Sequence, residues 1–301
     1  MRRKLRRVCL CLGLGVILAA GLAGCWMLLY NNWSVDPESR AEFVTNLNHA
    51  ITRTREWIIE VGENRALFQR EETAALLENP ALLHMVADCA HLSGDEQLQS
   101  VAMQYFRVVR RPYVGGRLID AGSRFEPPSD YESRALEDYQ RWFLHATAPA
   151  EYPLTAEDRA NMFSPDRYRG GSATHQLLSL YLYRNHNGGT PELDRVIRRI
   201  STRIASEAAI DFRVTDLYLQ RIAFVLAAGQ PDLIKRRWVE RALAAQQPDG
   251  GWLRSWHGWQ PKPYVFRFDA ASSTSHPTAQ GMWIAYMLKY RYPEWIERNY
   301  R

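Results

Sequence analysis

The chain of 301 residues carries 38 basic and 33 acidic side chains, a formal net charge of +5 at pH 7. Five of the basic residues lie within the first seven positions, which leaves the rest of the chain neutral. A nucleic-acid-binding protein would carry its excess charge on a folded face, so this distribution excludes that class of partner. The 46% hydrophobic and 24% charged content excludes disordered, collagen-like and coiled-coil chains.

The N-terminus predicts a membrane anchor. Residues 1–7 form a basic segment, and residues 8–30 follow as an uncharged apolar run. About 20 helical residues cross a bilayer, so residues 8–30 predict a transmembrane signal anchor. The basic segment is expected on the cytoplasmic side, which makes the chain single-pass. Residues 31–301 then form an extracytoplasmic domain, in the periplasm of a bacterial cell envelope.

Cysteine positions leave one alternative to the anchor open. Residues 22–25 (Leu-Ala-Gly-Cys) resemble a lipobox, in which Cys25 would be lipidated after cleavage. The chain stays apolar from Trp26 to Tyr30, where a lipoprotein normally becomes polar, and this favours the anchor. Either interpretation tethers the domain to a membrane. Cys89 is the only cysteine after residue 30, so the domain has no internal disulfide and no CxxC zinc motif.

Apolar residues recur at helical spacing along the domain, and no long alternating pattern predicts a strand. A Pro- and Gly-rich stretch over 112–130 predicts a long loop. The helices that the spacing and the flanking cap residues predict cover residues 38–61, 80–93, a segment starting at Asp95, 131–146, 173–186, 191–208, 213–228, 231–246 and 277–291. Short turns between the later helices predict antiparallel hairpins. Successive hairpins predict an all-α domain built as an α/α toroid, with an open α-solenoid as the alternative.

One turn carries a family resemblance. Residues 246–252 read Gln-Gln-Pro-Asp-Gly-Gly-Trp and close a predicted helix. This stretch resembles the Q-x-x-D-G-G-W turn of the terpenoid cyclase and protein prenyltransferase repeats, the α/α-toroid superfamily. The resemblance covers residues 173–291 and implies a toroid in which the turn is a structural clasp. Glycine permits the sharp turn, aspartate binds turn amides, and tryptophan buries a large surface.

The catalytic signatures of that superfamily are mostly absent. The sequence holds no Asp-x-Asp-Asp run for protonating a polyene and no Asp-Asp-x-x-Asp run for binding a diphosphate through magnesium. In the prenyltransferases zinc is bound by an Asp, a Cys two residues later and a His at the start of a later helix. The resemblance assigns the first and last of these to Asp216 and His276. Tyr218 occupies the cysteine position, so the thiolate ligand is missing.

Three titratable residues nevertheless lie near predicted helix starts. These are His175, Asp216 and His276, and in a toroid the N-terminal ends of the inner helices meet at one mouth. An Asp with two His can bind a divalent metal such as zinc, or act as acid and base, with Tyr218 as a neighbour. The alternative is that they are helix caps and hydrogen-bonded core residues.

An aromatic loop is the second candidate site. Its proposed substrate-binding residues are Trp252, Trp256, Trp259, Tyr264 and Asp269. Aromatic rings with a few polar groups suit a sugar, a lipid tail or a peptide. The alternative is that the rings pack the loop onto the domain.

Two classes of function remain open from the sequence. The first is an enzyme acting on an envelope glycan, lipid or peptide in the toroid mouth. The second is a non-catalytic binding or scaffold module that presents the loop of residues 252–268 to an envelope partner. The fold does not decide between them, because toroids host unrelated activities.

Overall fold

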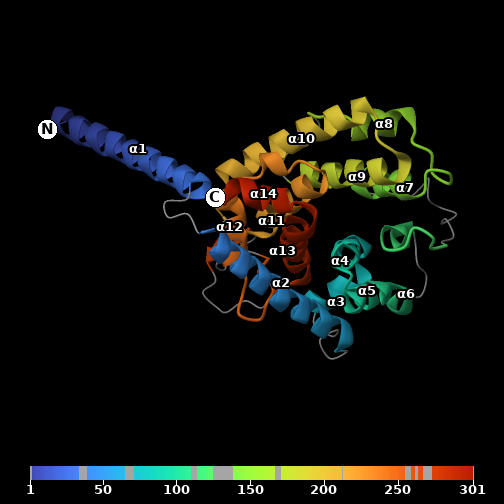
Figure 1. Ribbon diagram of the computed structural model, residues 1–301. Helices are drawn as coiled ribbons and strands as arrows, with labels where there is room; N and C mark the ends of the chain where they lie inside the picture. Colours follow the sequence, from blue (N-terminus) through green and yellow to red (C-terminus); the bar gives the residue numbers. More distant parts are fainter. Residues whose placement is uncertain are drawn as a thin grey trace.

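The computed structural model describes residues 2–33, 39–64, 71–109, 114–124, 138–166, 171–211, 213–254, 259–261, 264–266 and 273–300. The regular secondary structure of these residues is helical apart from one short hairpin (Figure 1), and the predicted all-α class is confirmed. The α-helices are α1 (Arg2–Asn32), α2 (Arg40–Glu63), α3 (Glu71–Glu78), α4 (Pro80–Ser93), α5 (Glu96–Met103), α6 (Tyr105–Val108), α7 (Asp138–Thr147), α8 (Ala156–Met162), α9 (Gly171–Asn187), α10 (Pro191–Ile210), α11 (Asp216–Ala227), α12 (Arg236–Ala244), α13 (Ser275–Tyr286) and α14 (Pro293–Asn299). The other elements are the 3-10 helices η2 (Val114–Leu118) and η3 (Pro231–Leu233), the π-helical turn η5 (Met287–Arg291), and the antiparallel strands β1 (Trp259–Pro261) and β2 (Tyr264–Phe266).

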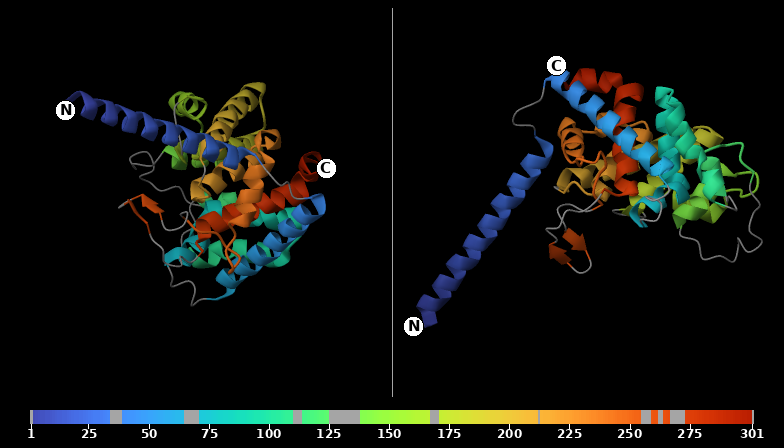
Figure 2. Two further views of the ribbon diagram at one scale, coloured as in Figure 1. Left: turned by 90° about the vertical axis from the view of Figure 1, so that its left-hand side faces the viewer. Right: turned by 90° about the horizontal axis from the view of Figure 1, so that it is seen from below.

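Helix α1 extends away from the other helices, which form one body (Figures 1 and 2). Its segment Gly13–Asn32 is long and apolar enough to cross a membrane, as the sequence predicted. The side chains of residues 13–26 are exposed in the structure. The helix continues without a break through Cys25.

Local cap signals explain why several helix boundaries were predictable. At the start of α4 the Asn79 side chain accepts the backbone N–H groups of Ala81 and Leu82, and Pro80 occupies the first turn. At its end Gly94 adopts φ = 72°, a left-handed conformation that favours glycine. Helices α9, α10 and α11 likewise begin and end within three residues of the predicted bounds.

Other boundaries differ from the predictions. The segment 231–246 is divided into η3 and α12, because Ile234 and Lys235 adopt extended backbone conformations. The last long helix begins at Ser275 and changes at Met287 into the π-helical turn η5. Helices α3, α8 and α14 were not predicted, since seven or eight residues hold too few turns to show a hydrophobic period. The 112–130 stretch, predicted as a loop, contains η2.

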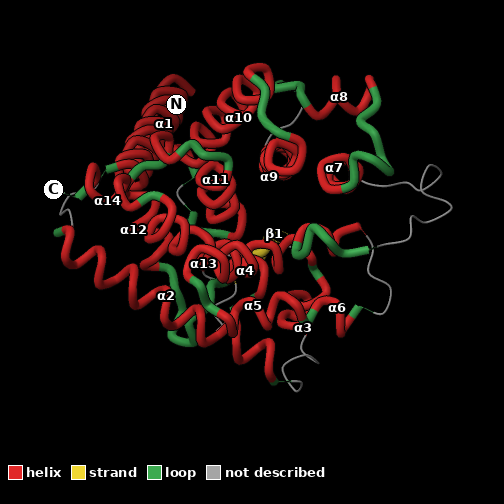
Figure 3. Tube along the Cα trace, turned by 45° about the vertical axis from the view of Figure 1, so that its right-hand side comes forward, coloured by secondary structure: helices red, strands yellow, loops and turns green. Residues whose placement is uncertain are grey.

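Helices α4, α9, α11 and α13 run in the same direction through the body, and Figure 3 shows their paths. The direction follows from contacts in which earlier residues of one helix meet earlier residues of the next, and later residues meet later ones. Between α11 and α13 these contacts are Asp216–His276 and Phe224–Trp283. Between α9 and α11 they are Thr174–Gln220 and Arg184–Ala228, and between α4 and α13 with η5 they are His84–Trp283 and Asp88–Arg291. Helix α10 packs against α9 and α11, and α12 packs against α11, α13 and α2.

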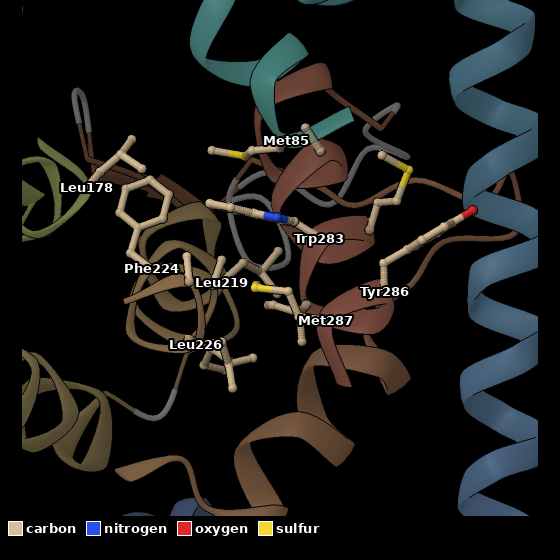
Figure 4. Packing of buried hydrophobic residues seen from close by; sticks show 14 of the residues in the cluster. Met85, Leu178, Leu219, Phe224, Leu226, Trp283, Tyr286 and Met287 are labelled. Atoms are coloured by element: carbon tan, nitrogen blue, oxygen red, sulfur yellow. The ribbon is translucent and has the colours of Figure 1, made fainter. Parts of the chain in front are cut away.

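Aromatic side chains fill the space between these parallel helices. Trp283 of α13 is fully buried and lies beside Phe224 of α11 (Figure 4). Its ring centroid is 5.9 Å from that of His84, 6.2 Å from that of Tyr181 and 6.2 Å from that of Phe224. Rings from α4, α9 and α11 thus meet around one tryptophan. The centre of the body is therefore a packed core at this level.

Candidate functional site

Asp216 and His276 meet at the N-terminal ends of α11 and α13. Asp216 is the first residue of α11, and His276 is the second residue of α13. The Nδ1 atom of His276 lies 2.6 Å from Oδ1 of Asp216. The Asp216 side chain is 27% exposed and that of His276 is 37% exposed, so solvent reaches the pair. The structure therefore brings two of the predicted site residues into direct contact.

The partner on Nδ1 determines what the other ring nitrogen can do. An ionised carboxylate only accepts hydrogen bonds, so opposite an ionised Asp216 the Nδ1–H group of His276 is the hydrogen-bond donor. Nε2 is then left with a lone pair, which can accept a proton or bind a metal. The amide nitrogen of Gln280, one helical turn further along α13, lies 3.1 Å from the same Nδ1. An amide nitrogen only donates, so an Nδ1 that donates to Asp216 requires the opposite amide orientation, with the Gln280 oxygen toward the ring.

Residues 252–254 join the starts of the two helices. The backbone of Trp252 forms a β-bridge with Thr274, the residue that precedes α13, and its N–H donates to Thr278 Oγ1 at 3.0 Å. Two residues later, the Arg254 carbonyl accepts the backbone N–H of Asp216 at 3.2 Å. One short segment therefore contacts both α11 and α13, and it sets the spacing between Asp216 and His276.

The turn before this segment is fixed to α2. The Gln246 side chain donates to the Gly250 carbonyl at 2.8 Å and to the Ala50 carbonyl at 3.0 Å. Thr54 donates to the same Gly250 carbonyl at 2.7 Å. Gly250 has φ = 95°, and a Cβ atom there would lie 2.4 Å from the Arg53 carbonyl oxygen. The turn thus requires glycine and serves as a clasp between helices.

Tyr218 and His175 occupy different positions relative to the pair. The Tyr218 hydroxyl donates to Asn31 of α1 at 3.1 Å, and burial raises the pKa of this phenol above its ordinary value. His175 is half-buried on α9. Its neighbour Thr174 donates to Gln220, one turn after Asp216 in α11, at 2.7 Å. His175 therefore lies at the same end of the helices as the pair.

The aromatic loop is described only in part. Trp252 is 1% exposed, and its indole N–H donates to the Ala242 carbonyl at 2.7 Å, so its ring packs the clasp. The backbones of Trp259 and Tyr264 belong to β1 and β2. Their side chains, together with Trp256 and Asp269, lie outside the described part of the chain.

The residues present do not fit the zinc site that the family resemblance implies. Among the described side chains, no group of three His, Cys, Asp or Glu residues is placed to hold a metal ion. Asp216 and His276 supply two donors. Tyr218, in the cysteine position, uses its hydroxyl to bind α1. Among the described side chains, the pair supplies one carboxylate and one imidazole, which suffice for acid–base chemistry.

Comparisons with known protein families, with curated proteins and with solved structures find no significant match.

Proposed function

We propose that this chain is a membrane-anchored extracytoplasmic enzyme with an α/α-toroid domain, in which His276 is a general acid–base residue oriented by Asp216. The observation that carries the proposal is the 2.6 Å contact between His276 Nδ1 and Asp216 Oδ1, with the imidazole partly exposed. A carboxylate that binds Nδ1 fixes the tautomer and the ring orientation, and both are needed for proton transfer at Nε2.

The toroid assignment is supported by the direction of the inner helices. Consecutive inner helices of a toroid are parallel because an outer helix connects each to the next. Here α9, α11 and α13 are parallel, and α10 and α12 run between them in sequence and pack outside. The clasp at Gln246–Trp252 joins α12 to α13 in the place where the family resemblance puts such a turn.

In the proposed reaction Nε2 of His276 accepts a proton from the water or hydroxyl that attacks the substrate, and returns it to the leaving group. Asp216 stays ionised and stabilises the imidazolium that forms between these steps. The proposed substrates are lipids, glycans or peptides of the cell envelope, because the anchor is expected to place the domain outside the cytoplasm.

Substrate turnover by the full-length protein in detergent tests this function. The protein is incubated with phospholipids, peptidoglycan fragments and peptides, and His276→Ala is compared with His49→Ala, which removes an exposed histidine of α2. We expect one class to be turned over, at a rate that His276→Ala lowers by about 10²- to 10⁴-fold. We expect Asp216→Asn to lower it by about 10- to 100-fold and His49→Ala to leave it unchanged. Turnover of no class, or equal turnover by His276→Ala, would refute the enzyme proposal.

One observation favours the second candidate, a binding or scaffold module. Trp283 and the three rings around it fill the space between the parallel helices at mid-height, where an enzyme that binds its substrate inside the toroid needs room. A scaffold requires no acid–base pair. Under this alternative His276→Ala changes stability alone, and none of the three substrate classes is turned over.

A further inference from the structure

The end of α1 packs into a polar site on the folded body. This site, called the socket below, is formed by the residues that bind the Asn31 side chain. Asn31 is 1% exposed, and its side-chain amide donates to the carbonyl oxygens of Ala208 at 2.8 Å and Ala209 at 2.9 Å. These carbonyls belong to the last turn of α10, where the i+4 backbone partners of the helix interior are missing. The Ala208 carbonyl also accepts the backbone N–H of Asp211 at 3.3 Å, and the Ala209 carbonyl accepts the Asn32 amide at 2.7 Å. The Asn31 oxygen accepts hydrogen bonds from Tyr218 and Arg241. The anchor therefore meets the domain through a fixed contact as well as through the chain.

The start of α12 lies against the same end of α1. Asn32 Oδ1 accepts hydrogen bonds from Lys235 Nζ at 2.9 Å and from the Trp238 indole at 3.2 Å. The Tyr30 carbonyl accepts one from Arg237 at 3.2 Å, and the Arg237 guanidinium lies 5.0 Å from the centre of the Tyr30 ring. The basic residues at the start of α12 are thus held beside the last turn of α1.

Aromatic residues mark where the membrane surface would cross α1. Trp26 and Tyr30 stack with ring centroids 5.4 Å apart, and both are exposed, as is Trp33. Trp and Tyr gather at the level of the lipid headgroups in membrane proteins. Residues 26–33 therefore mark the headgroup level. Lys235, which contacts Asn32, and Arg237, which contacts Tyr30, lie at the same level.

The charge and exposure of the surrounding face suit an anionic lipid surface. Residues 235–241 carry four basic side chains and one acidic one. Lys235 is exposed, and the buried Glu240 is paired with Arg236 and Arg237. Outside α1 and Trp33, the large hydrophobic side chains exposed on the described part of the chain are Ile210, at 68%, and Tyr290, at 40%. Ile210 directly follows Ala209, so it lies beside the socket.

We propose that this face, comprising Trp33, Ile210, Lys235 and Arg237, is a second membrane-contact surface that binds the phosphate groups of anionic phospholipids. It rests on α1 crossing the bilayer, as in the proposed function. Ile210 and Trp33 enter the interface, and Lys235 and Arg237 meet the headgroups. A lipid surface is favoured over a protein partner because the face adjoins the membrane segment and carries the charge opposite to that of anionic lipids.

Fluorescence quenching with the full chain in lipid vesicles tests the proposal. Cys9, Cys11 and Cys25 are replaced by Ser, the buried Cys89 is kept, and an environment-sensitive fluorophore is attached to Ile210→Cys. The matched control carries the label at Ser100→Cys, an exposed position on α5, which lies far from the end of α1 (Figure 1). We expect quenching of the label at position 210 by headgroup spin-labelled lipids, and several-fold less at position 100.

A label on native Cys25, with Cys9 and Cys11 replaced, separates the two proposals. Quenching at position 25 by acyl-chain spin labels together with quenching at 210 supports the new surface. Quenching at 25 with no excess at 210 over position 100 overturns the surface and leaves the anchor in place. No quenching at 25 overturns the membrane anchor of the proposed function, and the surface with it.

A charge substitution tests the headgroup contact itself. The relative association constant of spin-labelled phosphatidylglycerol over phosphatidylcholine is measured for the wild type, Lys235→Gln and Lys235→Arg. We expect Lys235→Gln to lower the preference for phosphatidylglycerol by up to about 5-fold and Lys235→Arg to retain it. Equal preference in the wild type and Lys235→Gln would overturn the role of Lys235, and no preference in the wild type would overturn anionic lipid binding.

Discussion

Replacement of Gly281 by alanine tests the packing of the clasp against α13. Gly281 lies within α13, under the buried ring of Trp252. A Cβ atom at this position would lie 2.7 Å from two atoms of the Trp252 ring and 2.8 Å from a third. Ordinary carbon–carbon contacts are about 3.5–4.0 Å. The ring or the helix must therefore move by about 1 Å to admit the methyl group.

The expected cost follows from two opposing effects. Overpacking a well-packed core costs about 1–3 kcal/mol. Displacing the ring also strains the 2.7 Å bond from its indole N–H to the Ala242 carbonyl. Alanine gains about 0.5–1 kcal/mol over glycine inside a helix. We therefore expect Gly281→Ala to lower the free energy of unfolding by about 1–2 kcal/mol, although the substitution favours helix in isolation.

Urea unfolding of the full chain in detergent, followed by far-UV circular dichroism, measures this change. Gly189→Ala is the matched control, because a Cβ atom there would meet its nearest neighbour, Arg184, at an ordinary 3.6 Å. The control is expected to change the free energy of unfolding by less than about 0.5 kcal/mol. A Gly281→Ala protein as stable as the wild type, or more stable, would refute the packing described for Trp252.

Three further variants test other parts of the structure. Asn31→Ala removes the oxygen that accepts from the buried Tyr218 and Arg241, and one of the two donors to each of the Ala208 and Ala209 carbonyls. We expect a loss of about 2 kcal/mol in the free energy of unfolding, measured by urea unfolding in detergent. Gln246→Leu leaves the clasp without its bonds to Ala50 and Gly250, and thermal unfolding should show a loss of about 1–2 kcal/mol. Burial lowers the pKa of His84, so the unfolded chain binds this proton more readily. The free energy of unfolding should then fall as the pH drops through about 6.5, the pKa of histidine in the unfolded chain. We expect the urea midpoint concentration to depend less on pH between pH 8 and 5 in His84→Gln than in the wild type. The same pH dependence in both proteins would contradict this.

Helix boundaries were predictable where the signal is local. Asn79, Pro80 and Gly94 act within their own turns, and α4 has the predicted bounds. The π-helical turn η5 was not predictable in this way, because nothing in the sequence of residues 287–291 stops the α-helical period. Its Arg291 is instead bound by Asp88 of α4 at 2.7 Å. A contact between residues about 200 apart in sequence thus accompanies the π-helical turn, and the periodic pattern of one segment carries no information about such a contact.

The candidate site was predictable in part for the same reason. Asp216 and His276 both stand at helix starts, and parallel helices bring their starts together, so their proximity followed from the pattern. The socket for Asn31 did not, since its partners lie more than 170 residues away. One signal was present in the sequence: Asn31 and Asn32 end an otherwise apolar run, and neighbouring polar side chains there need partners once buried.

The first turn of α11 connects the candidate site to helix α1. Asp216 binds His276, and Tyr218, two residues later, binds Asn31. Residues two apart on an α-helix point about 200° from one another, so the two contacts leave α11 on opposite sides. In the proposed reaction, a substrate that reaches His276 is then separated from the end of α1, which is proposed to cross the bilayer, by the diameter of one helix, about 10 Å. This geometry favours membrane lipids and lipid-linked glycans over free peptides as the first substrates to assay.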